Sequence, residues 1–330
     1  MGFKLTPEIK KLIKDTGSSD KRVAIAATAE LAKAVQIPLR KGVLSGDITG
    51  NIFETLVLEA GVVPEFPLDF IAPGTEDEYV AYVLPNHGYI PERHVEGDYV
   101  TLPTYSIGCA IDWARKYARS ARWDVVSRAM EVMRAQFVKK VNDDAWQTIL
   151  SAGYDRDIIV ADTDAGAGQF TKRLVSLMKV VMRRNGGGNS SSVNRGKLTD
   201  LYMSPEAVED IRNWNVDQVD ETTRRQIFLA EDGSFNRIFS VNLHDLDELG
   251  EGQEYQTYFT NLGGSMASGD VEIVVGLDLA NRDSFVMPIA QEVEIFEDEG
   301  LHRQRRAGFY GEAEIGVGVL SGARVLLGSL

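Results

Sequence analysis

The sequence predicts a mixed α+β fold, and two adjacent patterns carry that prediction. The run YVTLPTYSIGCAIDWA, from Tyr99 to Ala114, is rich in the aromatic and β-branched residues that favour strands. It leads through a short basic stretch into the longest helical pattern in the chain, which begins at Trp123 and ends at Gly153. Shorter helix and strand patterns follow, so we expect strands and helices to share a core.

The long helical pattern has apolar residues at spacings of three and four, which keep them on one face of an α-helix. Charged residues occupy the opposite face. A helix of about 28 residues extends roughly 42 Å at 1.5 Å per residue, well beyond the usual globular helix. The pattern therefore predicts a spine on which other elements lie. Its apolar positions are Val126, Met130, Met133, Phe137, Val141, Ala145 and Ile149.

Ahead of the spine, two strand-like segments predict a long protruding β-hairpin. They are Tyr79 to Val83 and Tyr99 to Tyr105, and the residues between them are turn formers without apolar periodicity. Thr6 and Pro7 near the N-terminus read as the N-cap and first residue of a short helix, and a second helix is expected from about Ser19 to Val35.

The middle of the chain reads as a compact α/β unit. FTKRLVSLMKVVMRRN, which ends at Asn185, predicts an amphipathic helix, and Leu198 to Trp214 predicts a strand followed by a helix. We expect QTYFTNLGGSMASGDVEIVVG to form two strands joined by a Gly and Ser loop. The closing run from Gln291 to Leu330 alternates apolar and polar residues and then becomes almost continuously apolar, as in a strand that enters a buried sheet.

Composition excludes several classes of site. The chain has 330 residues, 44% of them hydrophobic, and no run of about 18 apolar residues, so we expect neither export nor membrane insertion. The single cysteine, Cys109, excludes an internal disulfide and predicts a buried, inert thiol. The four histidines share no metal-ligand spacing. We expect no cofactor and no enzymatic activity.

Two motifs imitate functional loops without completing them. DTDAG, which begins at Asp162, starts like a calcium loop but places Arg173 at the twelfth position, where a bidentate Glu is required. GGSMA, which begins at Gly263, approaches a nucleophile elbow, but strand-like sequence follows it where that device needs a helix. We interpret the first as a solvated linker and the second as a hairpin loop.

The order of these elements resembles that of the HK97-fold major capsid proteins of tailed bacteriophages. The resemblance covers roughly residues 45 to 330 and rests on the hairpin, the TLP-type return strand and the spine helix ending in ILSAG. Three further stretches are similar to the family's axial domain, to its exit from that domain and to its closing strands. They are LTDLYMSPEAVEDIRNW, DVEIVVGLDLANRDSF and RQRRAGFYGEAEIGVGVLSGARVLL.

The resemblance implies a division of the chain along the HK97-like fold. The expected parts are an N-terminal arm (1–45), a lead-in (46–72), an extended loop (73–104), a peripheral domain with the spine helix (105–165), an axial domain (166–280) and return strands of the peripheral domain (281–330).

It also implies a structural function. Such a subunit self-assembles into hexamers and pentamers that close an icosahedral shell around double-stranded DNA, without sequence-specific binding. The implied partners are further copies of the chain, a scaffolding protein, a portal and a decoration protein, and the implied location is the virion, with assembly in the host cytoplasm. Two alternatives stay open, an encapsulin-type nanocompartment shell and a soluble α/β enzyme.

The uneven net charge of −14 suggests where copies meet. Residues 1–44 are basic, with a net charge of +5, residues 73–98 have a net charge of −5, and residues 113–140 have a net charge of +6. In the family the extended loop lies over the adjacent subunit's peripheral domain and spine, so we hypothesise that an acidic hairpin meets a basic spine. The candidate interface residues are Glu76, Asp77, Glu78, Glu92, Arg93 and Glu96 in the hairpin, Arg115, Arg119 and Arg122 before the spine, and Arg303, Arg305 and Arg306 at a C-terminal turn.

The best-known family member joins its extended loop to a neighbour through a Lys to Asn isopeptide bond. Residues 73–105 here contain no lysine, so we expect noncovalent contacts or a decoration protein to hold the shell.

Overall fold

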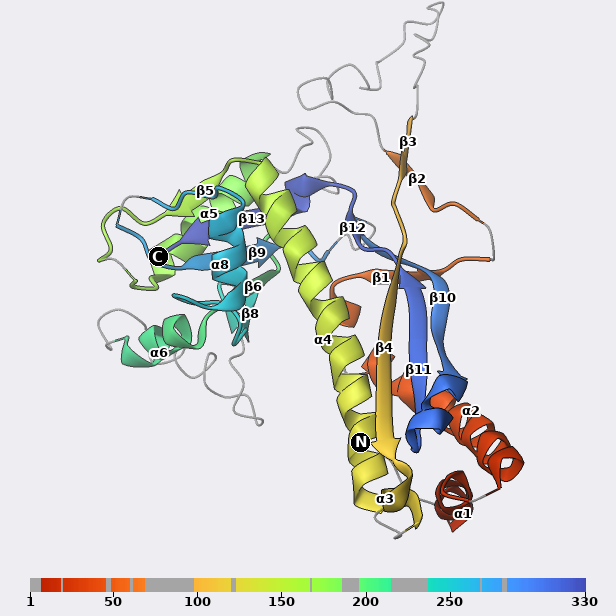
Figure 1. The fold of residues 1–330 in the computed structure, drawn as a ribbon. Coiled ribbons are helices and arrows are strands. Elements are labelled where there is room, and N and C mark those ends of the chain that lie inside the picture. Colours follow the sequence, from red (N-terminus) through yellow and green to blue (C-terminus); the bar gives the residue numbers. More distant parts are fainter. Residues whose placement is uncertain are drawn as a thin grey trace, which may run out of the picture. The chain divides into compact units, whose positions relative to one another are not determined.

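The structure is a computed structural model that describes residues 7–18, 20–45, 49–59, 62–68, 98–119, 123–166, 168–185, 196–214, 237–267, 269–280 and 284–330. The chain divides into two compact units (Figure 1). Unit 1 comprises Met1–Glu65, Thr101–Ala145 and Val286–Gly318, and unit 2 comprises Phe66–Val100, Trp146–Phe285 and Val319–Leu330.

The spine helix is confirmed. It is α4 (Trp123–Asp155), 33 residues long, and it contributes residues to both units. Every member of the predicted apolar stripe whose burial is described is buried, and the most exposed of them, Val141, is only 5% exposed. Arg128, Glu131 and Lys139 on the opposite face are exposed. The spacing of apolar residues therefore determined both the helix and the face that it buries.

Unit 1 is built on a five-stranded mixed sheet in the order β1-β10-β11-β4, with β12 paired to β10. β4 and β11 form a regular antiparallel ladder that begins with Arg306 opposite Ala114 and ends with Ile315 opposite Tyr105. The strands are β1 (Glu54–Val57), β4 (Tyr105–Ala114), β10 (Phe285–Glu297), β11 (Arg306–Ile315) and β12 (Gly318–Val319), and the 3-10 helices are η1 (Thr49–Asn51) and η4 (Glu299–Gln304).

The N-terminal helices of unit 1 are also confirmed. Their packing buries Ile13 and Leu31 completely. The second helix extends ten residues past its expected end at Val35. The helices are α1 (Pro7–Thr16), α2 (Lys21–Ser45) and α3 (Arg115–Arg119), the last of which follows β4 directly.

Unit 2 is built on a six-stranded mixed sheet in the order β5-β13-β9-β6-β8-β7. Its core includes Met178 and Val175 of α5 and Val208 and Ile211 of α6. The strands are β5 (Ile159–Ala161), β6 (Asp200–Met203), β7 (Arg237–Ile238), β8 (Val241–Asp245), β9 (Ile273–Leu277) and β13 (Val325–Ser329). The helices are α5 (Lys172–Asn185), α6 (Pro205–Asn213), α8 (Glu254–Asn261) and the 3-10 helix η5 (Gly322–Arg324).

The structure corrects one predicted element of unit 2. The segment that begins QTYFTN was expected to be a strand, but Glu254–Asn261 forms α8. The adjacent residues Tyr255 and Gln256 are both buried together with Phe259, a pattern that fits one face of a helix and not the alternation of a strand. GGSMA therefore connects a helix to β9 and is no hairpin loop.

The chain also divides at different positions from those expected. Residues 281–330 were predicted to return together to the peripheral domain, whereas Val319–Leu330 belongs to unit 2. The reason is that β13 pairs in parallel with β5 and antiparallel with β9, in the interior of the six-stranded sheet.

Of the predicted hairpin, only the return strand is described. It is β3 (Asp98–Thr101), and it forms a two-stranded sheet with β2 (Glu65–Leu68), upstream of the expected start at residue 73. The other expected strand, Tyr79 to Val83, lies outside the described residues. β3 and β4 are separate strands, and Pro103, which has no N–H to donate, lies between them.

Candidate functional site

The structure brings the described candidate arginines of unit 1 to one end of its sheet. Arg115 follows the last residue of β4, and its backbone N–H donates to the carbonyl of Arg305 at 3.1 Å. Arg306 opens β11 and pairs with Asp112 of β4, with 2.9 Å between Nη1 and Oδ2. Arg303 and Arg305 are exposed in the turn between β10 and β11. We call these four arginines and Lys116 the basic sheet end.

The basic sheet end also holds the N-terminal helices. Arg115 Nη2 donates to the carbonyl of Ser18, in the connection between α1 and α2, at 2.5 Å. Arg305 has a φ of 57°, in the left-handed region, because the turn into β11 is tight. The Arg115 guanidinium is thus held by a backbone carbonyl. Arg303, Arg305 and Arg306 remain exposed.

The side chains of the other candidate interface residues are not among those that the structure describes. Arg119 lies in α3, where the structure describes its backbone alone. The remaining candidates lie outside the described residues: Glu76, Asp77, Glu78, Glu92, Arg93, Glu96 and Arg122.

A polar seam joins β4 to the spine helix within unit 1. The Tyr105 hydroxyl donates to Asp144 Oδ2 at 2.8 Å, and Lys140 Nζ donates to Asp144 Oδ1 at 2.6 Å. Burial raises the pKa of Tyr105, and the hydrogen bond and negative charge of Asp144 raise it further. The hydroxyl therefore stays protonated and acts as a donor that fixes the strand on the helix.

Cys109 differs from its predicted environment. It is partly exposed on β4, and its thiol donates to Gln136 Oε1 of α4 at 2.6 Å. Burial raises the pKa of Cys109, so the thiolate that reactive cysteines need is disfavoured.

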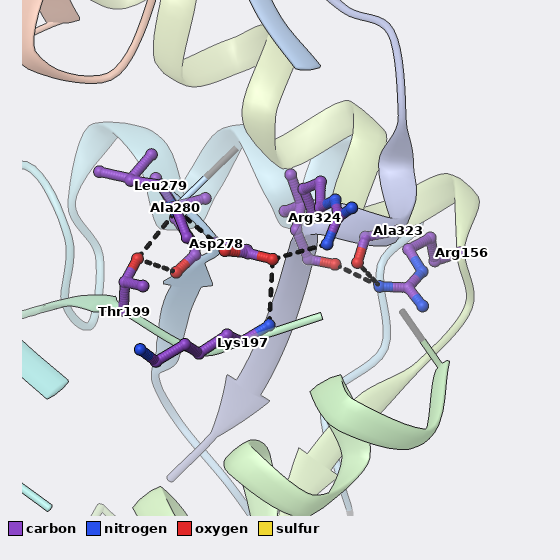
Figure 2. Close-up of polar contacts among 10 residues, drawn as sticks. Arg156, Lys197, Thr199, Asp278, Leu279, Ala280, Ala323 and Arg324 are labelled. Carbon is purple, nitrogen blue, oxygen red and sulfur yellow. Dashed lines mark hydrogen bonds and ion pairs between the residues drawn. The ribbon is translucent and has the colours of Figure 1, made fainter. Parts of the chain in front are cut away.

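Unit 2 contains a buried ion pair where β9 ends (Figure 2). Asp278 has no exposed surface, and its Oδ2 lies 2.7 Å from Nη1 of Arg324 in η5. The same oxygen accepts from the backbone N–H of Lys197 at 3.0 Å, and Oδ1 accepts from that of Ala280 at 3.2 Å. The Asp278 carboxylate thus links its own segment at the end of β9 to η5 and to the segment that contains Lys197.

Arg156 completes this cluster from the end of α4. Its Nη1 donates to the carbonyls of Ala323 and Val325, at 3.1 and 2.7 Å. Burial lowers the pKa of Arg156. Sequence reasoning missed the cluster, because Asp278, Arg324 and Arg156 are far apart in the chain. The one available signal was an acid, Asp278, directly after the continuous apolar run of β9.

The predicted linker at Asp162 is an ordered turn. Asp162 Oδ2 accepts from the Thr171 hydroxyl at 2.7 Å, and Arg173 forms ion pairs with both Asp162 and Asp164. The arginine at the twelfth position thus supplies the positive charge that calcium would supply in an EF-hand. Among the described residues no group of three His, Cys, Asp or Glu side chains could hold a metal ion.

No helix in the described part of the chain combines the length and apolar composition that crossing a bilayer requires. No protein-family model matches the sequence, and no curated protein sequence matches it.

Solved structures do match. The chain is similar to the capsid asymmetric unit of cyanophage Pam1, with a TM-score of 0.57 and 14% identity over 85% of this chain and 88% of that one. It is similar to the capsid structure of cyanophage P-SCSP1u, with a TM-score of 0.57 and 10% identity over 86% and 88%. It is also similar to the head structure of Helicobacter pylori bacteriophage KHP40, with a TM-score of 0.53 and 8% identity over 85% and 88%.

Proposed function

We propose that this chain, which has the HK97-like fold of tailed-phage capsid proteins, is the subunit of a capsid shell. The observation that carries the proposal is coverage, since the similarity spans 88% of each capsid chain and 85 to 86% of this chain. In this proposal unit 1 acts as the peripheral domain and unit 2 as the axial domain. Copies associate into hexamers and pentamers that close around double-stranded DNA.

The mechanism is interface geometry. The basic sheet end is a candidate contact for the acidic hairpin of a neighbouring copy, because its arginines come from α3, η4, the turn after η4 and β11 yet gather at one end of the sheet. Exposed ion pairs contribute only about 0 to 1 kcal/mol each, so such contacts set register more than affinity. Repetition over a shell multiplies even small contributions.

Partners follow from the same proposal. A scaffolding protein and a portal would act during assembly in the host cytoplasm, and a decoration protein would stabilise the finished virion.

Electron microscopy of the chain, expressed alone and with its neighbouring genes and sorted by size-exclusion chromatography, tests the proposal. Capsomer rings or closed shells are expected. Nucleic acid in the particles identifies a phage capsid, whereas enclosed protein identifies an encapsulin-type compartment. A persistent compact monomer under both conditions would overturn the shell proposal and return the enzyme alternative.

Charge reversal tests the hairpin contact. We expect Arg303→Glu with Arg305→Glu to lower the yield of assembled particles at low salt and to change its salt dependence, because both arginines are exposed and exposed charges are screened within about 10 Å at 0.1 M salt. Arg303→Lys with Arg305→Lys, which keeps both charges, serves as the control. Unchanged yield and salt dependence in the reversed variant would refute this contact.

A further inference from the structure

An exposed phenylalanine occupies a strained turn at the edge of the unit 2 sheet. β7 and β8 are joined by Phe239 and Ser240, whose φ angles are 49° and 66°. Positive φ at both central residues is typical of a type I′ turn, which favours Asn-Gly because larger side chains are strained there. Phe239 is 46% exposed. The Phe239 ring is therefore not fully buried within this chain, so its burial here does not offset the backbone strain of the turn.

Contacts on the backbone and the neighbouring side chains hold this turn. Lys179 Nζ of α5 donates to the carbonyl of Phe239 at 2.5 Å. Arg237 Nε donates to Oδ1 of Asn242, the residue opposite it in the hairpin, at 2.6 Å. The turn is thus fixed while its aromatic side chain remains available to a partner.

The described residues around the turn are basic. α5 contains no acidic residue, and neither does the hairpin from Arg237 to Asn242. Arg183 and Arg184 are exposed in the last turn of α5, the helix that reaches Phe239 through Lys179. We call the surface formed by Phe239, Lys179, Arg183, Arg184 and Arg237 the Phe239 edge.

The opposite end of the same strand is acidic. β8 runs from the turn to Asp245, about 16 Å at roughly 3.3 Å per residue. Residues 246–281, which follow β8, contain no lysine or arginine. α6 begins at the same end of the sheet, because β6 is parallel to β8 and α6 follows β6. We call the exposed acids of this end the acidic edge, namely Asp245, Asp247, Glu248, Glu251, Glu254 and Glu206.

We infer that the Phe239 edge of one copy binds the acidic edge of a second copy, so that unit 2 repeats head to tail around a ring. The inference rests on the proposed function and names the surfaces through which copies meet. A contact between two different surfaces forms a ring when its rotation closes, as the hexamers and pentamers of the proposed function require, whereas a two-fold contact of the Phe239 edge with itself would oppose like charges. The aromatic ring supplies a buried anchor, and the surrounding charges set orientation.

Glycine variants separate the aromatic ring from the backbone strain. Phe239→Gly removes the ring and relaxes the turn, so the variant monomer should unfold at the same or a higher temperature. Its assembly should nevertheless require about a tenfold higher protein concentration, as expected when an interface anchor is removed. Ser240→Gly relaxes the turn but keeps the ring, and it should assemble like the wild type. Wild-type assembly by Phe239→Gly would overturn the inference.

A mixing experiment tests the head-to-tail contact even if Phe239→Gly folds poorly. One variant carries Arg183→Glu, Arg184→Glu and Arg237→Glu, which change the net charge of its Phe239 edge from +4 to −2. The other carries Asp245→Lys, Asp247→Lys, Glu248→Lys and Glu251→Lys, which change the net charge of its acidic edge from −6 to +2. Each should fail to form rings alone at low salt. An equimolar mixture should form six-membered rings, in which the two variants alternate, and no five-membered rings.

Arg183→Lys, Arg184→Lys and Arg237→Lys together keep the charge of the Phe239 edge and should assemble normally. Ring formation by either reversed variant alone, or no rings in the mixture, would overturn the inference. Shells from the wild type in the same experiment would leave the proposed capsid function standing, whereas a wild type that forms neither rings nor shells would refute both.

Discussion

Asp278 is the residue on which the order of unit 2 depends most directly. Its carboxylate is completely buried, and it accepts hydrogen bonds from Arg324 and from two backbone N–H groups (Figure 2). A buried charge is tolerated only when paired and hydrogen-bonded, so its partners cannot be removed singly without leaving an uncompensated group.

Asp278→Ala should therefore lower the free energy of unfolding by about 3 to 5 kcal/mol, since it leaves the Arg324 guanidinium without its anion. Urea unfolding followed by circular dichroism measures the change. Arg212→Ala, which removes the exposed pair with Glu209, provides the control and should change stability by about 0.5 kcal/mol or less. Equal effects of the two variants would contradict the assignment of Asp278.

Glu272 predicts a pH dependence of unit 2. Burial raises its pKa, the hydrogen bond from Ser204 lowers it, and the nearby charges of Glu206 and Asp210 raise it further. The folded state thus prefers the protonated carboxyl, and stability is lost as pH rises through the folded-state pKa. Glu272→Gln keeps an acceptor for Ser204 without charge, so it should stabilise the protein at pH 7, and the gain should vanish towards pH 4.

The contribution of Asp200 to stability should change with pH in the opposite direction. Burial raises its pKa, but hydrogen bonds from His244, Asn242 and Thr199 outweigh burial and lower the pKa overall. Its contribution is present above the unfolded-state pKa of about 3.9 and is lost as pH falls through the folded-state pKa. Asp200→Asn should destabilise the protein at pH 7, with the loss shrinking below pH 4. Urea midpoints of both variants and of the wild type, from about pH 2.5 to pH 8, measure how each effect on stability changes with pH, and changes of the same sign would refute these assignments.

At the scale of elements, the ladder between β4 and β11 leaves no room for a side chain at Gly308. A Cβ at this position would lie 2.4 Å from the carbonyl oxygen of Ile111 and 2.8 Å from Leu301. Because the first of these atoms belongs to the backbone, the two strands would have to move apart.

Gly308→Ala should therefore lower the free energy of unfolding by about 1 to 3 kcal/mol. The matched control is Gly108→Ala in β4, where the nearest atom to a new Cβ is 3.5 Å away, and it should be almost neutral. Thermal unfolding compares the two variants. A neutral Gly308→Ala would show that the strands lie farther apart than described.

Elements were predictable where their own side chains decide the structure. The apolar stripe of α4 identified the helix, and Ser204 with Pro205 began α6 because the Ser204 hydroxyl accepts from the backbone N–H of Ala207. α8 was missed because its aromatic and β-branched residues favour a strand locally, while burial of the adjacent Tyr255 and Gln256 together with Phe259 favours a helix in the folded unit.

At the scale of the whole molecule, the pairing of strands that are distant in the chain could not be predicted from the sequence. β13 completes the unit 2 sheet beside β5, although about 160 residues separate them, and no local pattern distinguishes this partner from a strand of unit 1. The gathering of Arg115, Arg305 and Arg306 has the same origin, since the register of β4 and β11 brings them together. The strained Phe239 turn carries no Gly or Asn signal and could not be predicted.

In the proposed function this chain forms a closed shell from copies of itself. Single-particle reconstruction of assembled material, prepared with and without the neighbouring genes, would reveal such a shell. Icosahedral particles are expected, in which copies of this fold surround five-fold and six-fold positions. A chain that stays monomeric or dimeric at every protein concentration and salt, in both preparations, would contradict the proposed function.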